Sequence, residues 1–137
     1  MISAQGVGSA QLALIPLEIK TVKRALQFKV EVARTDEEQA RGLMFRSSLP
    51  NDGGMIFPMA PAREASFWMK DTIIPLDMIF IRSDGTIARI AAQTVPYDLT
   101  PVSSGEAVAA VLEIAGGQAA ALGIAENDHV TWKNTLR

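Results

Sequence analysis

The chain has 137 residues, a formal net charge of −2 and a pI near 5.4. This length predicts one domain that can bury a core without disulfides, and 48% apolar residues are too many for a disordered chain. Because the 13 lysines and arginines are scattered rather than clustered, the charge pattern argues against binding to DNA or RNA.

The chain contains no cysteine, which excludes disulfides, zinc–thiolate sites, iron–sulfur clusters and cysteine nucleophiles. No apolar run reaches the ~18–20 residues of a membrane-spanning helix. The N-terminal segment lacks the basic stretch of a signal peptide. We interpret residues 1–20 as a loose lead-in, with an edge strand around Gln11 to Ile15, and residues 21–137 as a single domain.

Alternating apolar residues from Leu26 to Val32 predict a strand with one buried face. A helix is predicted over about 36–46, and it begins with a capping box formed by Thr35 and Glu38. Gly42 lies inside this predicted helix and costs about 1 kcal/mol relative to alanine, which indicates a close approach by another backbone.

Short apolar segments separated by turn residues predict the rest of the fold. Further strands are expected at residues 55–57, 65–69, 76–82, 86–92, 107–114 and 128–133, and a short helix at about 117–122. Ser83-Asp84-Gly85 is typical of a hairpin turn. Many short strands without a βαβ rhythm predict a mainly β fold, either a compact antiparallel β-sandwich or a partly open barrel.

The motifs of familiar active sites are missing from the sequence. It has no Gly-rich nucleotide-binding loop, no HExxH and no EF-hand loop. The single histidine, His129, cannot form a multi-imidazole metal site, and no serine elbow accompanies it. Five of the six methionines lie between Met44 and Met78; thioethers can bind Cu(I), but we favour core packing for them. We therefore predict no metal site and no cofactor.

Polar side chains are densest between Phe67 and Asp77, directly before the apolar run at 78–81. An unpaired buried polar group costs roughly 1–3 kcal/mol, so the polar groups of this segment should have partners. The segment is therefore either a structural cluster of paired polar groups or a binding site. Trp68 and Lys70 lie on one face of the expected strand, where they offer a stacking or cation–π platform. We hypothesise that Arg41 and Arg46, which follow the first helix, reach the same end.

Three carboxylates are expected beside or within the core: Asp71, Asp77 and Glu113. A pair of them could serve as general acid and base, as in glycosidases, whose two carboxylates lie about 5–10 Å apart. A structural role is at least as natural, with Asp71 and Thr72 capping a turn and Asp77 accepting backbone N–H groups. We favour the structural role for each.

Several motifs occur in a fixed order between about residues 30 and 130. They are GLMFR at 42–46, GM at 54–55 followed by Phe57, FWMKDT at 67–72, PLD at 75–77, VLE at 111–113, AG at 115–116 and GI at 123–124. In these motifs the chain resembles the DUF192 (UPF0127) family. Two positions depart from the family pattern: Asp71 replaces the usual asparagine, and Asn127-Asp128-His129 replaces a Gly-Asp-Arg-type turn.

The resemblance implies a compact β-rich fold and no assigned reaction. Members of the family are bacterial and archaeal and often carry a signal or lipoprotein leader, so the resemblance implies a periplasmic or exported location, with a cytoplasmic one as the alternative. The positions that match family motifs with polar or shape-specific character are Arg46, Trp68, Lys70, Thr72, Pro75, Asp77 and Glu113.

We expect a small extracytoplasmic domain that binds a small molecule, an envelope component or another partner, and that is not an enzyme. The candidate ligand-binding residues are Arg46, Trp68, Lys70, Asp71, Thr72, Asp77 and Glu113. One alternative is a carboxylate-dependent hydrolase of a saccharide or envelope polymer, with Asp71, Asp77 or Glu113 as acid and base. The other is a purely structural or assembly module.

Overall fold

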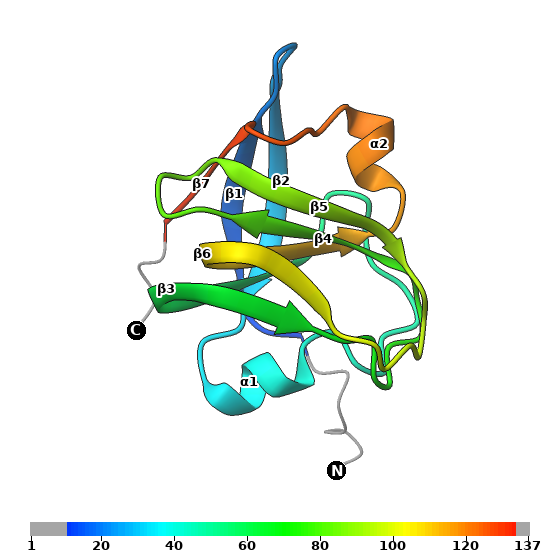
Figure 1. Cartoon of the computed structure of the whole chain (residues 1–137). Coiled ribbons are helices and arrows are strands. Elements are labelled where there is room, and N and C mark those ends of the chain that lie inside the picture. Colours follow the sequence, from blue (N-terminus) through cyan, green and yellow to red (C-terminus); the bar gives the residue numbers. More distant parts are fainter. Residues whose placement is uncertain (1–10, 134–137) are drawn as a thin grey trace.

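The structure is a computed structural model, and it describes residues 11–133. Within them, a single curled sheet is flanked by two short helices (Figure 1). Its strands are β1 (Leu14–Lys20), β2 (Ala25–Val32), β3 (Met55–Phe67), β4 (Leu76–Ile81), β5 (Ile87–Thr94), β6 (Val102–Ala115) and β7 (His129–Trp132), and its helices are α1 (Asp36–Arg41) and α2 (Gln118–Leu122). The predicted fold class, mainly β with a partly open barrel, is confirmed.

The strand order is β5-β4-β6-β3-β2-β1-β7, so the two ends of the chain's sheet are β5 and β7. Neighbouring strands are antiparallel except β2 and β3, which are parallel with Glu31 opposite Met55. The curl brings β7 back to the start of β5, where Thr86 and His129 form an isolated bridge. The N–H of Ile87 donates to the Asp128 carbonyl at 2.9 Å. The barrel is therefore partly closed at this edge.

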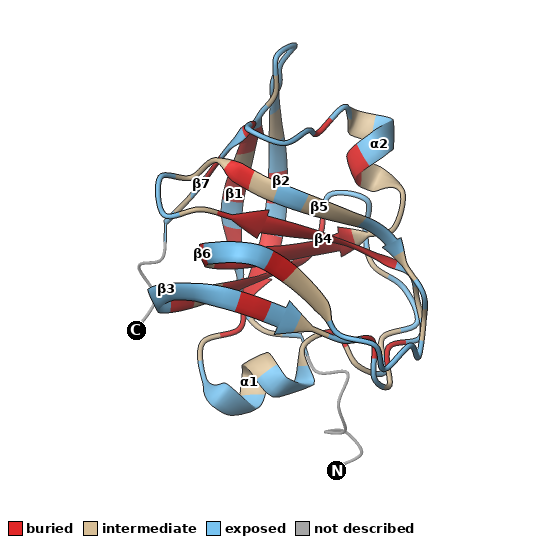
Figure 2. Cartoon of the chain, in the orientation of Figure 1, coloured by how far each residue is buried: buried red, intermediate tan, exposed pale blue. Residues whose placement is uncertain are grey.

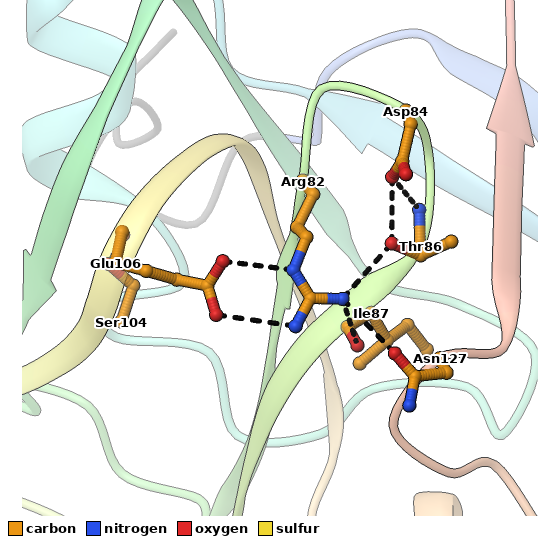
Figure 3. A network of polar contacts seen from close by, with 7 residues as sticks. All are labelled: Arg82, Asp84, Thr86, Ile87, Ser104, Glu106 and Asn127. Atoms are coloured by element: carbon orange, nitrogen blue, oxygen red, sulfur yellow. Dashed lines mark hydrogen bonds and ion pairs between the residues drawn. The ribbon is translucent and has the colours of Figure 1, made fainter.

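A polar network around Arg82 reinforces this closure (Figure 3). The guanidinium of Arg82 donates to both carboxylate oxygens of Glu106 at 2.9 and 3.3 Å. It also donates to the hydroxyl of Thr86 at 3.1 Å and to the side-chain oxygen of Asn127 at 3.2 Å. One side chain thus joins the β4–β5 turn, β6 and the segment before β7.

The barrel interior is one hydrophobic core to which all seven strands contribute. It holds Ile15, Leu17, Ile19, Phe28, Val30, Val32, Ile56, Ile79, Ile81, Ile87, Ala110, Leu112, Ile114 and Val130, with Ala119 and Ile124 from the region of α2. We call it the inner core. The alternation that predicted β2 from the sequence is the alternation of residues facing this core and residues facing away.

A second hydrophobic core covers the opposite face of β3, β4 and β6. This outer core contains Ala33, Leu43, Met55, Phe57, Met59, Ala65, Met69, Leu76, Met78, Phe80, Val108 and Val111. Because both faces of β4 are covered, its six residues are all buried (Figure 2), which explains the continuous apolar run at 78–81. Four of the five clustered methionines pack here, as the preference for core packing expects.

Helix α1 ends earlier than the predicted range of 36–46. Thr35 and Glu38 form the expected capping box, but Gly42 is the C-cap, with φ +52° and ψ −130°. A Cβ on Gly42 would lie 3.3 Å from the ring of Phe57, so the close neighbour is an aromatic side chain rather than a backbone. The residues after Gly42 are then free to cross the outer core as a loop.

Three strands run through segments that sequence patterns assigned to loops; one of them is β6, which begins at Val102 and not at the expected residue 107. The separate strands expected at 55–57 and 65–69 are one strand, β3, with register shifts between Pro58 and Arg63 and between Glu64 and Ser66. The shifts break the period of two, so the sequence shows no continuous alternation there. Leu14–Lys20, which fell largely in the expected lead-in, is β1 and pairs with both β2 and β7.

No helix among residues 11–133 is long and apolar enough to cross a membrane. In the same residues, no group of three or more histidine, aspartate or glutamate side chains is placed to hold a metal ion. His129 is exposed in β7, and its ring nitrogen Nε2 lies 3.0 Å from the Asp84 carbonyl oxygen.

Candidate functional site

A pocket of about 260 Å³ opens on the outer face of the sheet, between the end of α1 and the far half of β3. Its lining residues are Gln39, Ala40, Arg41, Gly42, Leu43, Met44, Phe57, Met59, Arg63, Ser66, Phe67, Trp68, Lys70, Thr72 and Glu113. We call it the outer-face pocket. Its apolar walls come from Leu43, Phe57 and Met59 of the outer core and from Phe67, and the rings of Phe57 and Phe67 meet edge to face with centroids 5.0 Å apart.

Sheet register places Glu113 at this pocket. In one row across the outer face, Glu31 of β2 lies opposite Met55 of β3, Met55 opposite Glu113 of β6, and Glu113 opposite Met78 of β4. Side chains of one such row point to the same side of a sheet. A glutamate therefore stands between two buried methionines, where the strand pattern calls for an apolar residue.

Glu113 is 4% exposed, and no residue among 11–133 forms a hydrogen bond with its carboxyl group. Its oxygens are not among the buried atoms without a partner, and the residue lines the pocket, so they face the pocket rather than the sealed core. Burial raises the pKa of Glu113 to about 8 because the charged form loses its hydration. At neutral pH this group is mostly a neutral acid that can both donate and accept a hydrogen bond.

The other glutamate of the row, Glu31, is buried to a similar degree but is fully paired. Its two carboxylate oxygens accept from Arg46 at 2.8 and 3.0 Å, in a bidentate ion pair. One of the oxygens also accepts the N–H of Leu12 at 2.7 Å. The same face of the sheet therefore holds two buried glutamates. Glu31 is hydrogen-bonded by protein groups, whereas the carboxyl group of Glu113 faces the pocket.

Three cationic side chains line the outer-face pocket: Arg41, Arg63 and Lys70. All three are exposed, and within the described part of the chain none forms an ion pair or a hydrogen bond through its charged group. The ammonium of Lys70 lies 5.5 Å from the ring centroid of Trp68, which is itself 47% exposed. Among residues 11–133, Glu113 is the only acidic residue in the lining, so cations surround the mouth of the pocket.

The register shifts in β3 help to build the pocket. They fall between Pro58 and Arg63 and between Glu64 and Ser66, and Arg63 and Ser66 both line the cavity. A bulge bends a strand and redirects its side chains, and bulges are frequent beside functional sites. The irregular part of β3 is thus the part that presents polar groups to the pocket.

Four of the seven residues singled out from the sequence line the outer-face pocket: Trp68, Lys70, Thr72 and Glu113. The hydroxyl of Thr72 donates to the Lys70 carbonyl at 3.0 Å, so this residue also holds the turn between them. Asp71 lies outside the lining. Its backbone is in the left-handed region, with φ +52°, and its carbonyl accepts the N–H of Phe45 at 2.9 Å.

Asp77 does not reach the pocket. It precedes Met78 in β4, and its side chain lies on the other face of the sheet, where one carboxylate oxygen accepts the N–H groups of Gln93 at 2.8 Å and Gly117 at 3.0 Å. The other accepts the N–H of Ala119 at 2.8 Å. The structural alternative for Asp77 therefore describes its contacts, and Asp77 and Glu113 do not face one another.

Arg46 also lies outside the outer-face pocket, because its guanidinium is engaged by Glu31. In that place it fastens the loop after α1 to the sheet and so positions the pocket wall at Gly42 and Leu43. Sequence reasoning missed Gln39, Phe57, Met59 and Arg63 as lining residues. The signal that could have found Arg63 was a continuous strand from 55 to 67, which the bulges concealed.

Comparison with known proteins places this architecture in a family. Residues 18–132 match the DUF192 family, described as "Uncharacterized ACR". The chain belongs to the DUF192 family. Within the match lie all fifteen lining residues of the outer-face pocket.

Two solved structures are similar to this DUF192 protein along nearly its whole length. A protein of unknown function from Novosphingobium aromaticivorans DSM 12444 is 43% identical with a TM-score of 0.87, over 96% of this chain and 98% of that one. A protein from Sinorhizobium meliloti 1021, described as a "putative transcription regulator", is 36% identical with a TM-score of 0.87, over 91% of this chain and 98% of that one. No curated protein matches the sequence.

Proposed function

We propose that this DUF192 protein binds a small molecule in the outer-face pocket. The observation that carries the proposal is Glu113, a buried carboxyl group that faces a pocket and forms no hydrogen bond with residues 11–133. The same sheet face shows with Glu31 how a buried carboxyl group is satisfied by protein partners, whereas the oxygens of Glu113 face a pocket that a ligand can enter. A ligand supplies the missing partner.

The rest of the pocket suits the same role. Apolar and aromatic walls with a few convergent polar groups are typical of ligand sites. A volume of about 260 Å³ lies just below the ~300–1,000 Å³ of sites for drug-sized ligands, so the ligand is small. Trp68, half-exposed beside the opening, offers an aromatic surface to whatever enters.

The geometry argues against the carboxylate-pair hydrolase. Such a mechanism needs two carboxylates on either side of the scissile bond. Of the residues that the structure describes, Glu113 is the only one that brings a carboxyl group to the pocket lining; Asp71 lies outside the lining, and Asp77 is bonded to backbone on the opposite face. A perturbed pKa at Glu113 is compatible with acid catalysis, but the second group is missing from the lining.

The proposal does not extend to DNA binding, although the Sinorhizobium meliloti relative is described as a "putative transcription regulator". Helix-turn-helix regulators place a recognition helix in the major groove of DNA. In the described residues α1 has six residues and α2 has five. The chain's net charge of −2 offers no basic stripe for the phosphates.

We place this binding function at the cell envelope as part of the proposal. The support is the family pattern itself, in which leaders for export are frequent. Fractionation of cells that express the tagged full-length gene product tests it. Recovery in the cytoplasmic fraction would remove the envelope from the proposal and leave the binding site unchanged.

A thermal-shift screen tests the binding function directly, with envelope saccharides and small metabolites as the compounds. A ligand at 100 times its dissociation constant stabilises the folded state by about 2.7 kcal/mol, which gives a clear rise in melting temperature. We expect Trp68→Ala to weaken any hit while changing the stability of the unliganded protein little, because Trp68 is 47% exposed.

Tyr97→Ala is the matched control, since Tyr97 is a 59% exposed aromatic residue outside the pocket lining. It should leave the shift of every hit unchanged. If no compound stabilises the wild type, or if Tyr97→Ala abolishes the hits as Trp68→Ala does, the outer-face pocket is not the binding site.

A further inference from the structure

We infer that the ligand of the outer-face pocket is a small organic anion. Its charged group lies at the rim formed by Arg41, Arg63 and Lys70, and an uncharged hydrogen-bonding group, such as a hydroxyl, reaches Glu113. This inference rests on the proposed binding function and adds the chemical class of the ligand.

The cationic side chains at the rim of the pocket favour an anionic ligand. Arg41, Arg63 and Lys70 come from α1, β3 and the segment after β3, so the fold brings three cations from separate elements to one opening. Arg82, by contrast, is held by Glu106 and Arg46 by Glu31. In the described part of the chain, the three rim cations have no acidic neighbour in the lining except Glu113, and a positive potential at a cleft mouth concentrates anions.

Glu113, which forms the floor of the pocket, favours an uncharged partner group. A ligand ammonium at Glu113 would have to pass the three rim cations and then replace the hydration of a fully buried charge pair. Glu31 shows what such a pair requires on this face: a bidentate guanidinium and an additional backbone N–H. Glu113 lacks comparable support among the described residues, and burial favours its neutral form, which matches a hydroxyl.

The apolar walls and the volume of the pocket limit the ligand further. An apolar middle part of the pocket lies between the charged rim and the polar floor. It is lined by Leu43, Phe57, Met59 and Phe67. The pocket volume of about 260 Å³ suits one ring or a short chain. The ligand is therefore polar at both ends and apolar between them.

Three probes of similar shape and different charge test the inference: para-hydroxybenzoate, its neutral amide para-hydroxybenzamide and the cationic para-hydroxybenzylamine. Each is measured by calorimetry and thermal shift, alongside a panel of aliphatic hydroxycarboxylates with their amides and amines. We expect the acids to bind at least about tenfold more tightly than the corresponding amides, and the amines to bind most weakly.

Variants of the three rim residues show whether these cations bind the charged group of the ligand. Arg41→Gln, Arg63→Gln and Lys70→Gln should each weaken the acids about three- to fivefold and leave the amides unchanged, with a smaller effect at high salt. Arg24→Gln is the matched control, because Arg24 is an exposed arginine outside the pocket lining. Benzoate, which lacks the hydroxyl, should bind more weakly than para-hydroxybenzoate.

The outcomes separate the two proposals. Amides or amines that bind as tightly as the acids, or rim variants that behave like Arg24→Gln, would overturn the anion class while the binding function stands. If no member of any charge class binds, the proposed function itself fails together with this inference.

Discussion

Two glutamates in one row of the sheet, Glu31 and Glu113, illustrate how much a partner matters for a buried charge. Both are less than 5% exposed. Glu31 is held by a guanidinium and a backbone N–H, whereas Glu113 faces a cavity and its pKa rises to about 8. A buried acid with a strongly perturbed pKa in a pocket is a frequent property of functional sites.

Glu113 makes the stability of the protein depend on pH. Its pKa is raised from 4.5 in the unfolded chain to about 8 in the folded one, so only the unfolded state releases the proton between these values. The contribution of Glu113 to the free energy of unfolding therefore falls as pH rises from 4.5 and levels off above about 8. At about 1.4 kcal/mol per pKa unit, the full loss approaches about 5 kcal/mol.

Glu113→Gln should remove this dependence, because glutamine keeps the size and polarity but does not ionise. We expect the variant to be more stable than wild type at pH 9 by several kcal/mol and nearly equal at pH 4, as measured by urea unfolding. Glu126→Gln, at an exposed position, is the control and should leave the pH profile unchanged. Parallel profiles for wild type and Glu113→Gln would contradict a raised pKa at Glu113.

The two departures from the family pattern share a backbone explanation. Asp71 has φ +52° and Asn127 has φ +72°, both in the left-handed region. Asparagine and aspartate are enriched there among residues with a side chain, and glycine enters it without strain. Asparagine and aspartate at the first position, and glycine and asparagine at the second, therefore satisfy the same backbone requirement.

At the scale of elements, α2 illustrates a helix that depends on one side chain. It has five residues, far fewer than the ~12–15 that a helix needs for stability alone in water. Asp77 accepts the N–H groups of Gly117 and Ala119 at its start, and Ala119 is buried in the inner core. Asp77 thus holds α2 in the position where it covers part of the inner core.

Asp77→Asn should loosen α2. One acceptor oxygen becomes an NH₂ group that faces the N–H of Ala119 or Gln93, and we expect a cost of about 2–4 kcal/mol in urea unfolding. Hydrogen exchange at Ala119 should accelerate, while ligand binding to the folded variant should persist because the pocket is on the other sheet face.

Asp52→Asn is the control for this substitution, since Asp52 is exposed in a turn, and its change in stability should stay within about 0.5 kcal/mol. An Asp77→Asn protein that is as stable as the control would show that the three N–H groups find other partners.

At the scale of the whole molecule, one sheet serves two cores. The inner core holds the barrel together, and the outer core holds the loop after α1 and the segment after β3 against β3, β4 and β6. The outer-face pocket lies where this second covering is incomplete. The Glu31–Arg46 ion pair fastens one wall of it, with side-chain exposures of 4% and 11%.

Breaking this pair should affect the fold and the pocket together. We expect Glu31→Gln to cost about 3 kcal/mol in chemical unfolding, because it removes the carboxylate from a buried ion pair. Ligand affinity should fall as well, since the loop carries Gly42 and Leu43 of the pocket wall.

Glu106→Gln removes the same charge from the exposed Arg82–Glu106 pair and should cost less than about 1 kcal/mol. Equal losses for the two variants would show that burial does not strengthen the Glu31–Arg46 pair.

Local patterns predicted the elements that depend on near neighbours in the chain. The alternation in Leu26 to Val32, the capping box at Thr35 and the Ser83-Asp84-Gly85 hairpin were all confirmed. Where irregular backbone interrupts a period, as in β3 between Pro58 and Ser66, the same reasoning failed. The helix end was misplaced for a related reason, because Gly42 was interpreted as helical when its φ of +52° ends the helix.

The sequence by itself determined the fold class, the family and a short segment rich in polar groups, because these follow from periodicity and motif order. It could not separate Asp77 from Glu113, since both read as acids within apolar strands. Only the tertiary structure gave Asp77 three backbone partners and Glu113 none among residues 11–133, because sheet register and contacts between residues distant in the sequence decide which groups meet.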